Sequence, residues 1–360
     1  NSLIKKHIRN LKPLVGLNSI TAQRLILRLL KILYKYPTLI ELENRQFIKM
    51  RYYNPGQFTS KGRGSETEAR LLFTTRYLAK GKCIFSILKE DKDWILIKPK
   101  DMNPFKLPRT AVVNSLRTYS GVRHMDITGE QEYAIVKPEL VPRDVLRQIG
   151  LASKAAKQAA LDIREAFNSI AGNVLLTRKL QIPSPNIYWV AFYSTEPLLG
   201  TTDRINVRVA DSKLSKIITL YLNSSIVLFQ LLAFHIETRG AWIRLDKDGV
   251  WSEIHVPDFQ RLNKDIKALA LSVFNKVSRQ DTMPIYDRIK NGDSIQIEID
   301  KVALEMLGLN KWKNKLSDIY SAIIDELDAM LEILKRSKKS SKKRIKEKRD
   351  KSKQLRLDNF

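Results

Sequence analysis

With 360 residues, of which 43% are hydrophobic and 28% charged, the chain is long enough for two or three domains with at least one substantial core. Its 64 Lys and Arg residues outnumber 38 Asp and Glu residues, and the net charge of +26 favours a polyanionic partner, above all nucleic acid. A single cysteine excludes an intramolecular disulfide framework and a cysteine-based zinc site, and four scattered histidines show no metal-ligand spacing.

The positive charge is unevenly distributed along the chain. Between Lys335 and Arg356 there are 13 basic and two acidic residues, so +11 of the +26 lies in this tail and +15 on the rest. The tail lacks apolar periodicity and is predicted to be a disordered arm that binds phosphates without reading sequence. Because the rest of the chain is also strongly basic, we expect a binding surface on the fold itself.

The first region, up to about residue 140, is predicted to be a mixed α/β accessory or linker unit. Helical periodicity extends over residues 2–36 and is strongest at 22–36, where leucine and isoleucine recur every three or four positions. Short β-like runs follow at 83–88 and 94–98, separated by a charged turn.

A DNA target-recognition domain is expected at 141–261, followed by a helical region at 262–334 and the basic tail at 335–360. One long helix is predicted from Leu140 to Ser169, because Pro142 suits a first helical turn and the sequence is rich in alanine. The pattern then predicts strands at 174–180, 188–194 and 205–209, helices at 212–222 and 225–237 joined at a capping Asn223, and a β-like segment within 240–256. The fold class is therefore α/β (α+β).

The longest apolar run, near 217–236, is interrupted by polar residues and is predicted to be a buried helix pair instead of a membrane span. No signal peptide is visible, and the single cysteine agrees with a reducing compartment. These features predict a cytoplasmic protein with no membrane partner.

Three segments carry a family resemblance in a fixed order: GNVLLTRKLQI (172–182), LYLNSSIVLFQLLAFHIETRGAWIRLDK (220–247) and IHVPD (254–258). The order resembles the target-recognition region of N6-adenine DNA methyltransferases, which is related to the specificity subunits of type I restriction-modification systems. LPRTAVVNSLRTYSGVRHMDITG (107–129) resembles the linker before that region, and the likeness covers about residues 105–330. It implies sequence-specific binding of double-stranded DNA.

The catalytic signature of such methyltransferases is missing from this chain. The enzymes need an S-adenosylmethionine site and an Asn-Pro-Pro-aromatic tetrapeptide that holds a flipped adenine. Asn103-Pro104-Phe105 lacks the second proline, and Asn54-Pro55-Gly56 lacks both that proline and the aromatic residue. We therefore expect no cofactor in this chain, and the resemblance implies S-adenosylmethionine for an associated methyltransferase catalytic domain or subunit.

Basic residues near predicted strand ends and turns are the candidate DNA contacts. They are Arg178, Lys179, Arg204, Arg208, Arg239, Trp242, Arg244 and Lys247, together with Lys61 and Arg63 in the turn-rich segment 51–65. In a strand, Arg204 and Arg208 would share one face. The structural alternative is solvated surface charge for the basic residues and a core position for Trp242.

Two other classes of function remain open from sequence. The first class is an enzyme, either a nuclease or a methyltransferase with a divergent site. Glu90-Asp91-Lys92 resembles the acidic-x-Lys fragment of metal-dependent nucleases, but no matching upstream acidic motif accompanies it. Alternatively, it is a nonspecific basic scaffold for a catalytic subunit, which predicts equal affinity for all duplexes.

Overall fold

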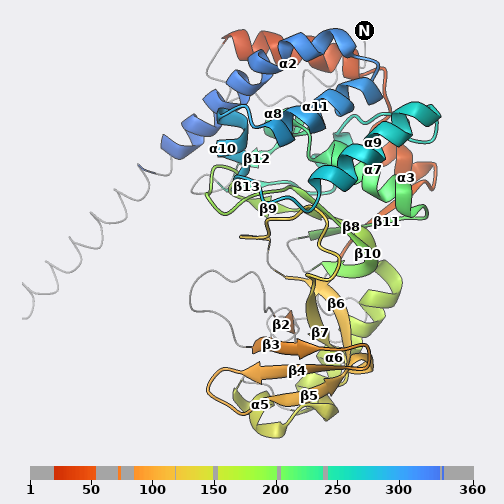
Figure 1. Ribbon diagram of the computed structural model, residues 1–360, viewed down its shortest axis with the longest axis vertical. Coiled ribbons are helices and arrows are strands. Elements are labelled where there is room, and N and C mark those ends of the chain that lie inside the picture. The colour runs from red at the N-terminus through yellow and green to blue at the C-terminus, as the bar shows by residue number, and fades with distance from the viewer. Residues whose placement is uncertain are drawn as a thin grey trace, which may run out of the picture.

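A computed structural model describes residues 20–53, 72–73, 85–117, 119–148, 153–200, 204–237, 242–332 and 335. The described part is mixed α/β, which confirms the predicted class. The molecule is elongated, with a small sheet and two helices at one end and most of the helices at the other (Figure 1). Buried apolar side chains form two clusters, one at each end.

A seven-stranded sheet links the two ends in the order β1-β11-β8-β10-β6-β7-β2. Among the described strand pairs of this sheet, β10–β6 alone is parallel. The strands are β1 (Ile48–Tyr52), β2 (Leu72–Phe73), β6 (Val112–Leu116), β7 (Glu132–Ile135), β8 (Gly172–Thr177), β10 (Ala191–Gly200) and β11 (Arg204–Val209). The predicted strands after residue 172 are thus confirmed, although β10 begins later than the predicted 188–194 strand and continues through Pro197 to Gly200.

Strand β10 changes partner along its length. Ala191–Tyr193 pair with β8, and Leu199 and Gly200 pair with β6, with a register shift between Tyr193 and Leu198. Pro197 is accommodated at this irregularity, since proline cannot donate to a sheet ladder. At the start of β8, a Cβ atom on Gly172 would lie 2.2 Å from the carbonyl oxygen of Val207, so the approach of β8 to β11 requires glycine there.

The end of the molecule at the bottom of Figure 1, called the lower end, is built on a three-stranded antiparallel sheet of β3 (Phe85–Glu90), β4 (Trp94–Pro99) and β5 (Phe105–Pro108). The two predicted β-like runs correspond to β3 and β4, and β5 is an additional strand. Its inner face shares a buried cluster with alanines and Ile163 of α6 (Ser153–Ile170). The predicted single helix over 140–169 is wrong in part. Its first residues form a 3₁₀ turn, η2 (Pro138–Leu140), and α5 (Arg143–Gln148) starts after Pro142. A second 3₁₀ turn, η1 (Arg109–Ala111), precedes β6.

The other end of the molecule, at the top of Figure 1 and called the upper end, is mainly helical. Its elements are α2 (Ile20–Leu33), α3 (Leu39–Asn44), α7 (Ser212–Leu222), α8 (Ser225–Phe234), η3 (Trp251–Glu253), α9 (Lys264–Val277), α10 (Ile285–Lys290), α11 (Ser294–Met306), η4 (Asn310–Lys315) and a last helix over 316–332. The predicted helical region after 262 is confirmed. Helices α2 and α3 and strand β1 pack in the same cluster as residues 174–330, although they belong to the first region of the sequence.

Helices α7 and α8 form the predicted buried pair, and every residue from Ser225 to Leu232 is buried. No single helix in the described ranges is long and apolar enough to cross a membrane; α7 and α8 together reach that length and composition but are bent by 65°. The predicted capping role of Asn223 is wrong, because Ser224 caps α8 by accepting from the Val227 N–H. Asn223 instead ends α7 and hydrogen-bonds the backbone of Val190 and Ala191.

A buried polar network ties α8 to the C-terminal helices. The Asp300 carboxylate accepts hydrogen bonds from the Ser225 N–H at 2.6 Å, the Tyr320 hydroxyl at 2.6 Å and the Gln296 amide at 3.1 Å. Burial raises the pKa of Asp300 to about 6, although these hydrogen bonds oppose the rise. Arg288 lies next in the network, donating from Nε to Gln296 at 2.8 Å, with its guanidinium 4.0 Å from the Trp189 ring centroid.

Candidate nucleic-acid interface

Five of the predicted contact residues meet around a small antiparallel sheet with the strand order β12-β13-β9. Its strands are β9 (Lys179–Leu180), β12 (Ile236–Glu237) and β13 (Ile243–Arg244). The 225–237 helix prediction is therefore too long by its last residues, which form β12. Strands β9 and β13 are more than 60 residues apart in sequence, so only the fold brings the basic residues together.

One face of this sheet is basic and carries an exposed indole. Ile243 pairs with Leu180 and both are buried, whereas Arg244 pairs with Lys179 and both are exposed. Trp242 precedes Arg244 by two residues, is 39% exposed, and has the Lys179 Nζ 5.7 Å from its ring centroid. Lys179, Trp242 and Arg244 together are called the β9–β13 face. The core position considered for Trp242 is excluded by its exposure.

A carboxylate beside this face positions two arginines. Asp246 accepts from the Arg178 Nε at 2.8 Å through Oδ1 and from the Arg244 Nε at 2.7 Å through Oδ2. The Arg178 guanidinium also lies 4.6 Å from the Tyr52 ring centroid. Arg244 remains 47% exposed, and its terminal amino groups have no partner among the residues that the structure describes. The ion pair therefore fixes the arginine stem and leaves donors for a ligand.

Lys247 serves a different purpose. Its Nζ lies 2.7 Å from the Glu43 Oε2, and only 15% of its side chain is exposed. Burial raises the pKa of Glu43, but hydrogen bonds from Lys247, the Met50 N–H and Arg51 outweigh it, so the pKa stays below its usual value. This ion pair holds the residues after β13 against α3 and β1, which makes Lys247 a support of the face.

Arg204 and Arg208 do not share an exposed face. Arg204 is 1% exposed, stacks 4.0 Å from the Tyr119 ring centroid, and donates to the Arg117 carbonyl at 3.1 Å. Arg208 is exposed but donates from Nε to the Ala171 carbonyl at 3.0 Å, beyond the end of α6. In these positions Arg204 is a core residue and Arg208 caps a helix end, and neither lies in the β9–β13 face.

Three predicted contact residues, Lys61, Arg63 and Arg239, lie outside the described residues. Two residues that sequence reasoning did not single out, Asp246 and Glu43, turn out to organise the basic cluster. The only sequence signal for Asp246 is its place two positions after Arg244, which favours the same side of an extended chain. Glu43 gives no local signal, because its partner Lys247 lies about 200 residues away.

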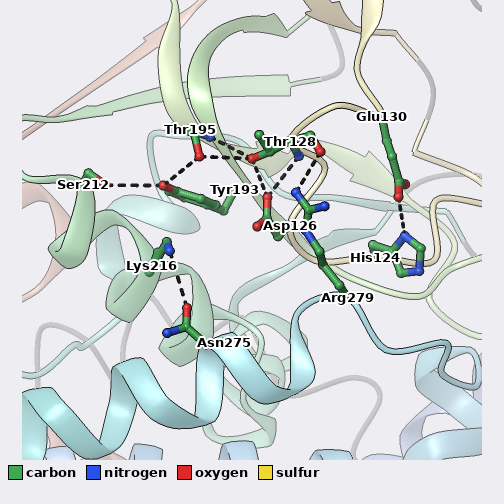
Figure 2. Close-up of polar contacts among 10 residues, drawn as sticks. All are labelled: His124, Asp126, Thr128, Glu130, Tyr193, Thr195, Ser212, Lys216, Asn275 and Arg279. Carbon is green, nitrogen blue, oxygen red and sulfur yellow. Dashed lines mark hydrogen bonds and ion pairs between the residues drawn. The ribbon is translucent and has the colours of Figure 1, made fainter.

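A second polar cluster fastens the segment 121–131 to the upper end (Figure 2). Asp126 accepts from the Thr128 hydroxyl at 2.5 Å and pairs with the Arg279 Nε at 3.3 Å. The Thr128 and Thr195 hydroxyls are 3.3 Å apart, and the His124 Nδ1 lies 2.8 Å from the Glu130 carboxylate. These groups are engaged with one another, which indicates a structural joint.

The described residues contain no group of three or more His, Cys, Asp or Glu side chains that could hold a metal ion. In the nuclease-like fragment, Glu90 accepts from the Tyr133 hydroxyl at 2.6 Å and lies 3.8 Å from the Arg109 guanidinium. Its carboxylate thus has structural partners.

Comparison with solved structures gives a distant likeness. No family model matches the sequence, and no curated protein matches it. The fold is similar to a crystal structure of the type IIG restriction endonuclease BpuSI, at 10% sequence identity and a TM-score of 0.47, over 87% of this chain and 33% of that one. This chain thus spans about a third of that restriction enzyme's length, and a likeness of this size assigns neither family nor function.

Proposed function

We propose that this chain is the sequence-reading part of a DNA adenine-methylation or restriction-modification system, with its methyl-transfer site outside these 360 residues. The observation that carries the proposal is the β9–β13 face. It combines the exposed cations Lys179 and Arg244 with the partly exposed indole of Trp242. The Asp246 carboxylate fixes the position of the Arg244 side chain. Lys and Arg are the side chains that most often contact phosphates and guanine edges in protein–DNA interfaces.

The arrangement of the resembling segments supports the same reading. The segment 172–182 supplies β8 and β9, and 220–247 supplies part of α7, α8, β12 and β13. The two segments meet in the pairing of β9 with β13. The two resembling segments, which are separate in sequence, therefore form one surface in the structure, and this surface carries the exposed basic residues.

Binding would use two kinds of contact. The net charge of +15 outside the tail attracts the duplex and fixes its register through phosphates, and the β9–β13 face reads base edges. Arg239, which lies outside the described residues, is proposed as a further DNA contact on the strength of the family resemblance alone. S-adenosylmethionine and the flipped adenine would be held by the associated methyltransferase domain or subunit.

The proposal is tested with a double variant, Lys179→Ala/Arg244→Ala, and a matched control, Lys264→Ala/Lys301→Ala, which removes the same charge from exposed positions on α9 and α11. Fluorescence anisotropy measures affinity for two duplexes of about 40 base pairs, one carrying the motif that the wild-type chain selects and one of random sequence. We expect the first variant to lose roughly 10-fold or more in affinity for the selected duplex and much less for the random one, because base contacts act only at the recognised site. The control should change neither.

An equal, small loss in both variants would contradict the proposal and favour the nonspecific scaffold. The enzyme alternative has its own test, in which the isolated chain is incubated with DNA, magnesium and labelled S-adenosylmethionine. Cleavage or methyl transfer by the chain alone would contradict an external active site.

A further inference from the structure

The sheet β3-β4-β5 presents a second basic face, remote from the β9–β13 sheet along the chain and in Figure 1. Along β4, Ile95 and Ile97 are fully buried in the lower core, and the alternating residues Trp94, Leu96 and Lys98 lie on the opposite side. The side of the sheet away from the core is therefore available to a ligand.

The strand register gathers lysines around Trp94. Leu96 pairs with Lys106 on β5 and with Lys89 on β3, so both lysines share its side of the sheet. The Lys106 Nζ lies 4.5 Å and the Lys89 Nζ 5.6 Å from the Trp94 ring centroid. Lys98 extends the row along β4. These four residues and Leu96 are called the Trp94 face.

No acidic side chain pairs with the three lysines of the Trp94 face among the residues that the structure describes. Glu90 pairs in register with the buried Ile95 and bonds Tyr133, which takes it to the other side of the sheet. Other carboxylates lie in the neighbourhood: Asp91 and Asp93 are in the turn between β3 and β4 with Lys92, and Asp101 and Asp144 line a surface pocket together with Lys98. All three lysines are exposed, and an antiparallel sheet with one core face usually keeps its other face mixed in charge or polar. Three exposed lysines around one indole, none of them in a salt bridge with a described residue, point to an anionic ligand.

The composition of the face indicates which anion. The positive charges are all lysines, whose ammonium groups bind phosphates as rotatable point charges and do not demand bidentate geometry. The two ammonium groups near the indole occupy the region where a base would stack, so the Trp94 ring serves to hold them in place. Such a surface suits the regular phosphates of a duplex and gives no readout of base sequence.

We infer that the Trp94 face binds the phosphate backbone of duplex DNA flanking the segment read by the β9–β13 face. The inference rests on the proposed function. Strands β9 and β13 lie in the upper part of the molecule, and strands β3, β4 and β5 lie at its lower end (Figure 1). A bound duplex would have to extend past the recognised site to reach the Trp94 face, so the contact contributes only with longer DNA.

The test uses Lys89→Ala/Lys98→Ala/Lys106→Ala, the charge-keeping variant with three arginines at the same positions, and a control with Lys157, Lys264 and Lys301 changed to Ala. Three phosphate contacts correspond to a slope of about 2.7 in log affinity against log salt. Raising salt fourfold should therefore weaken the wild-type chain on a duplex of about 40 base pairs by roughly 40-fold more than the triple-alanine variant. The arginine variant and the control should follow the wild type.

Duplex length provides the second readout. On a short duplex of about 12 base pairs, the wild type and the triple-alanine variant should bind alike, since one face occupies the DNA. Sequence preference, measured by selection from randomised duplexes, should be the same for both.

Wild-type salt dependence in the triple-alanine variant would overturn this inference while leaving the proposed function intact, provided that Lys179→Ala/Arg244→Ala remains defective. A changed sequence preference would also overturn it, because the face would then read bases. If the chain binds no duplex at all, the proposed function fails first. Thermal unfolding of each variant checks that the exposed substitutions leave the fold unchanged.

Discussion

The buried carboxylate of Asp300 predicts a specific dependence of stability on pH. Its pKa is raised from 3.8 to about 6 because the folded chain removes it from water. For an acid with a raised folded pKa, the folded state binds the proton more tightly than the unfolded state. The free energy of unfolding contributed by this group is therefore highest below about pH 4 and falls as pH rises towards 6.

The expected size follows from the two pKa values. Between about pH 4.5 and about pH 7.5, Asp300 should lower the free energy of unfolding by about 2 kcal/mol. The variant Asp300→Asn has a similar shape and no charge to titrate, so other groups titrate alike in both proteins. Urea unfolding at the two pH values measures the difference between wild type and variant, with the fluorescence of Trp189 close to the network as one reporter.

The difference between wild type and Asp300→Asn should shift by about 2 kcal/mol in favour of the variant at the higher pH. The same difference at both pH values would refute the reasoning. In that case the carboxylate is either solvated in the folded chain or compensated by the nearby Arg288, whose own pKa burial lowers to about 10.

Three further predictions concern DNA binding. Trp242→Ala should weaken duplex binding by roughly 10-fold without lowering thermal stability, whereas Leu269→Ala, at an equally exposed position, should leave affinity unchanged. Asp246→Ala removes a negative charge, yet it should weaken duplex binding by roughly 3- to 10-fold, because Arg178 and Arg244 lose the carboxylate that positions them. Tighter binding by this variant would show that only net charge matters. Deleting residues 336–360 should weaken binding to every duplex by a similar factor and reduce the dependence of log affinity on log salt, with sequence preference retained. Loss of the sequence preference would contradict the assignment of the tail as a nonspecific arm.

The elements that sequence predicts well are those with strong local patterns. The apolar residues of α7 and α8 and the alternating residues of β11 mark these elements without reference to the rest of the chain. Ser224 is a local signal as well, but Asn223 competes for the capping role, and only the contact of Asn223 with β10 decides between them.

The candidate site is less predictable, because its members come together through long-range pairing. Arg204 and Lys179 look alike in sequence, since each is a basic residue at one end of a predicted strand. The structure buries Arg204 against Tyr119, and it exposes Lys179 opposite Arg244. Which of the two basic residues faces outward depends on the packing of segments more than 60 residues apart, and side-chain type alone carries no information about it.

The claim that this chain reads DNA sequence is tested most directly by selection from a pool of duplexes with a randomised central segment. The wild-type chain, without any partner, is used to recover bound duplexes over several rounds, and Lys179→Ala/Arg244→Ala is treated in parallel. We predict that the wild type enriches one short motif and that the variant enriches it weakly or not at all. Recovery of all sequences in equal proportion by a wild-type chain that still binds DNA would contradict the account.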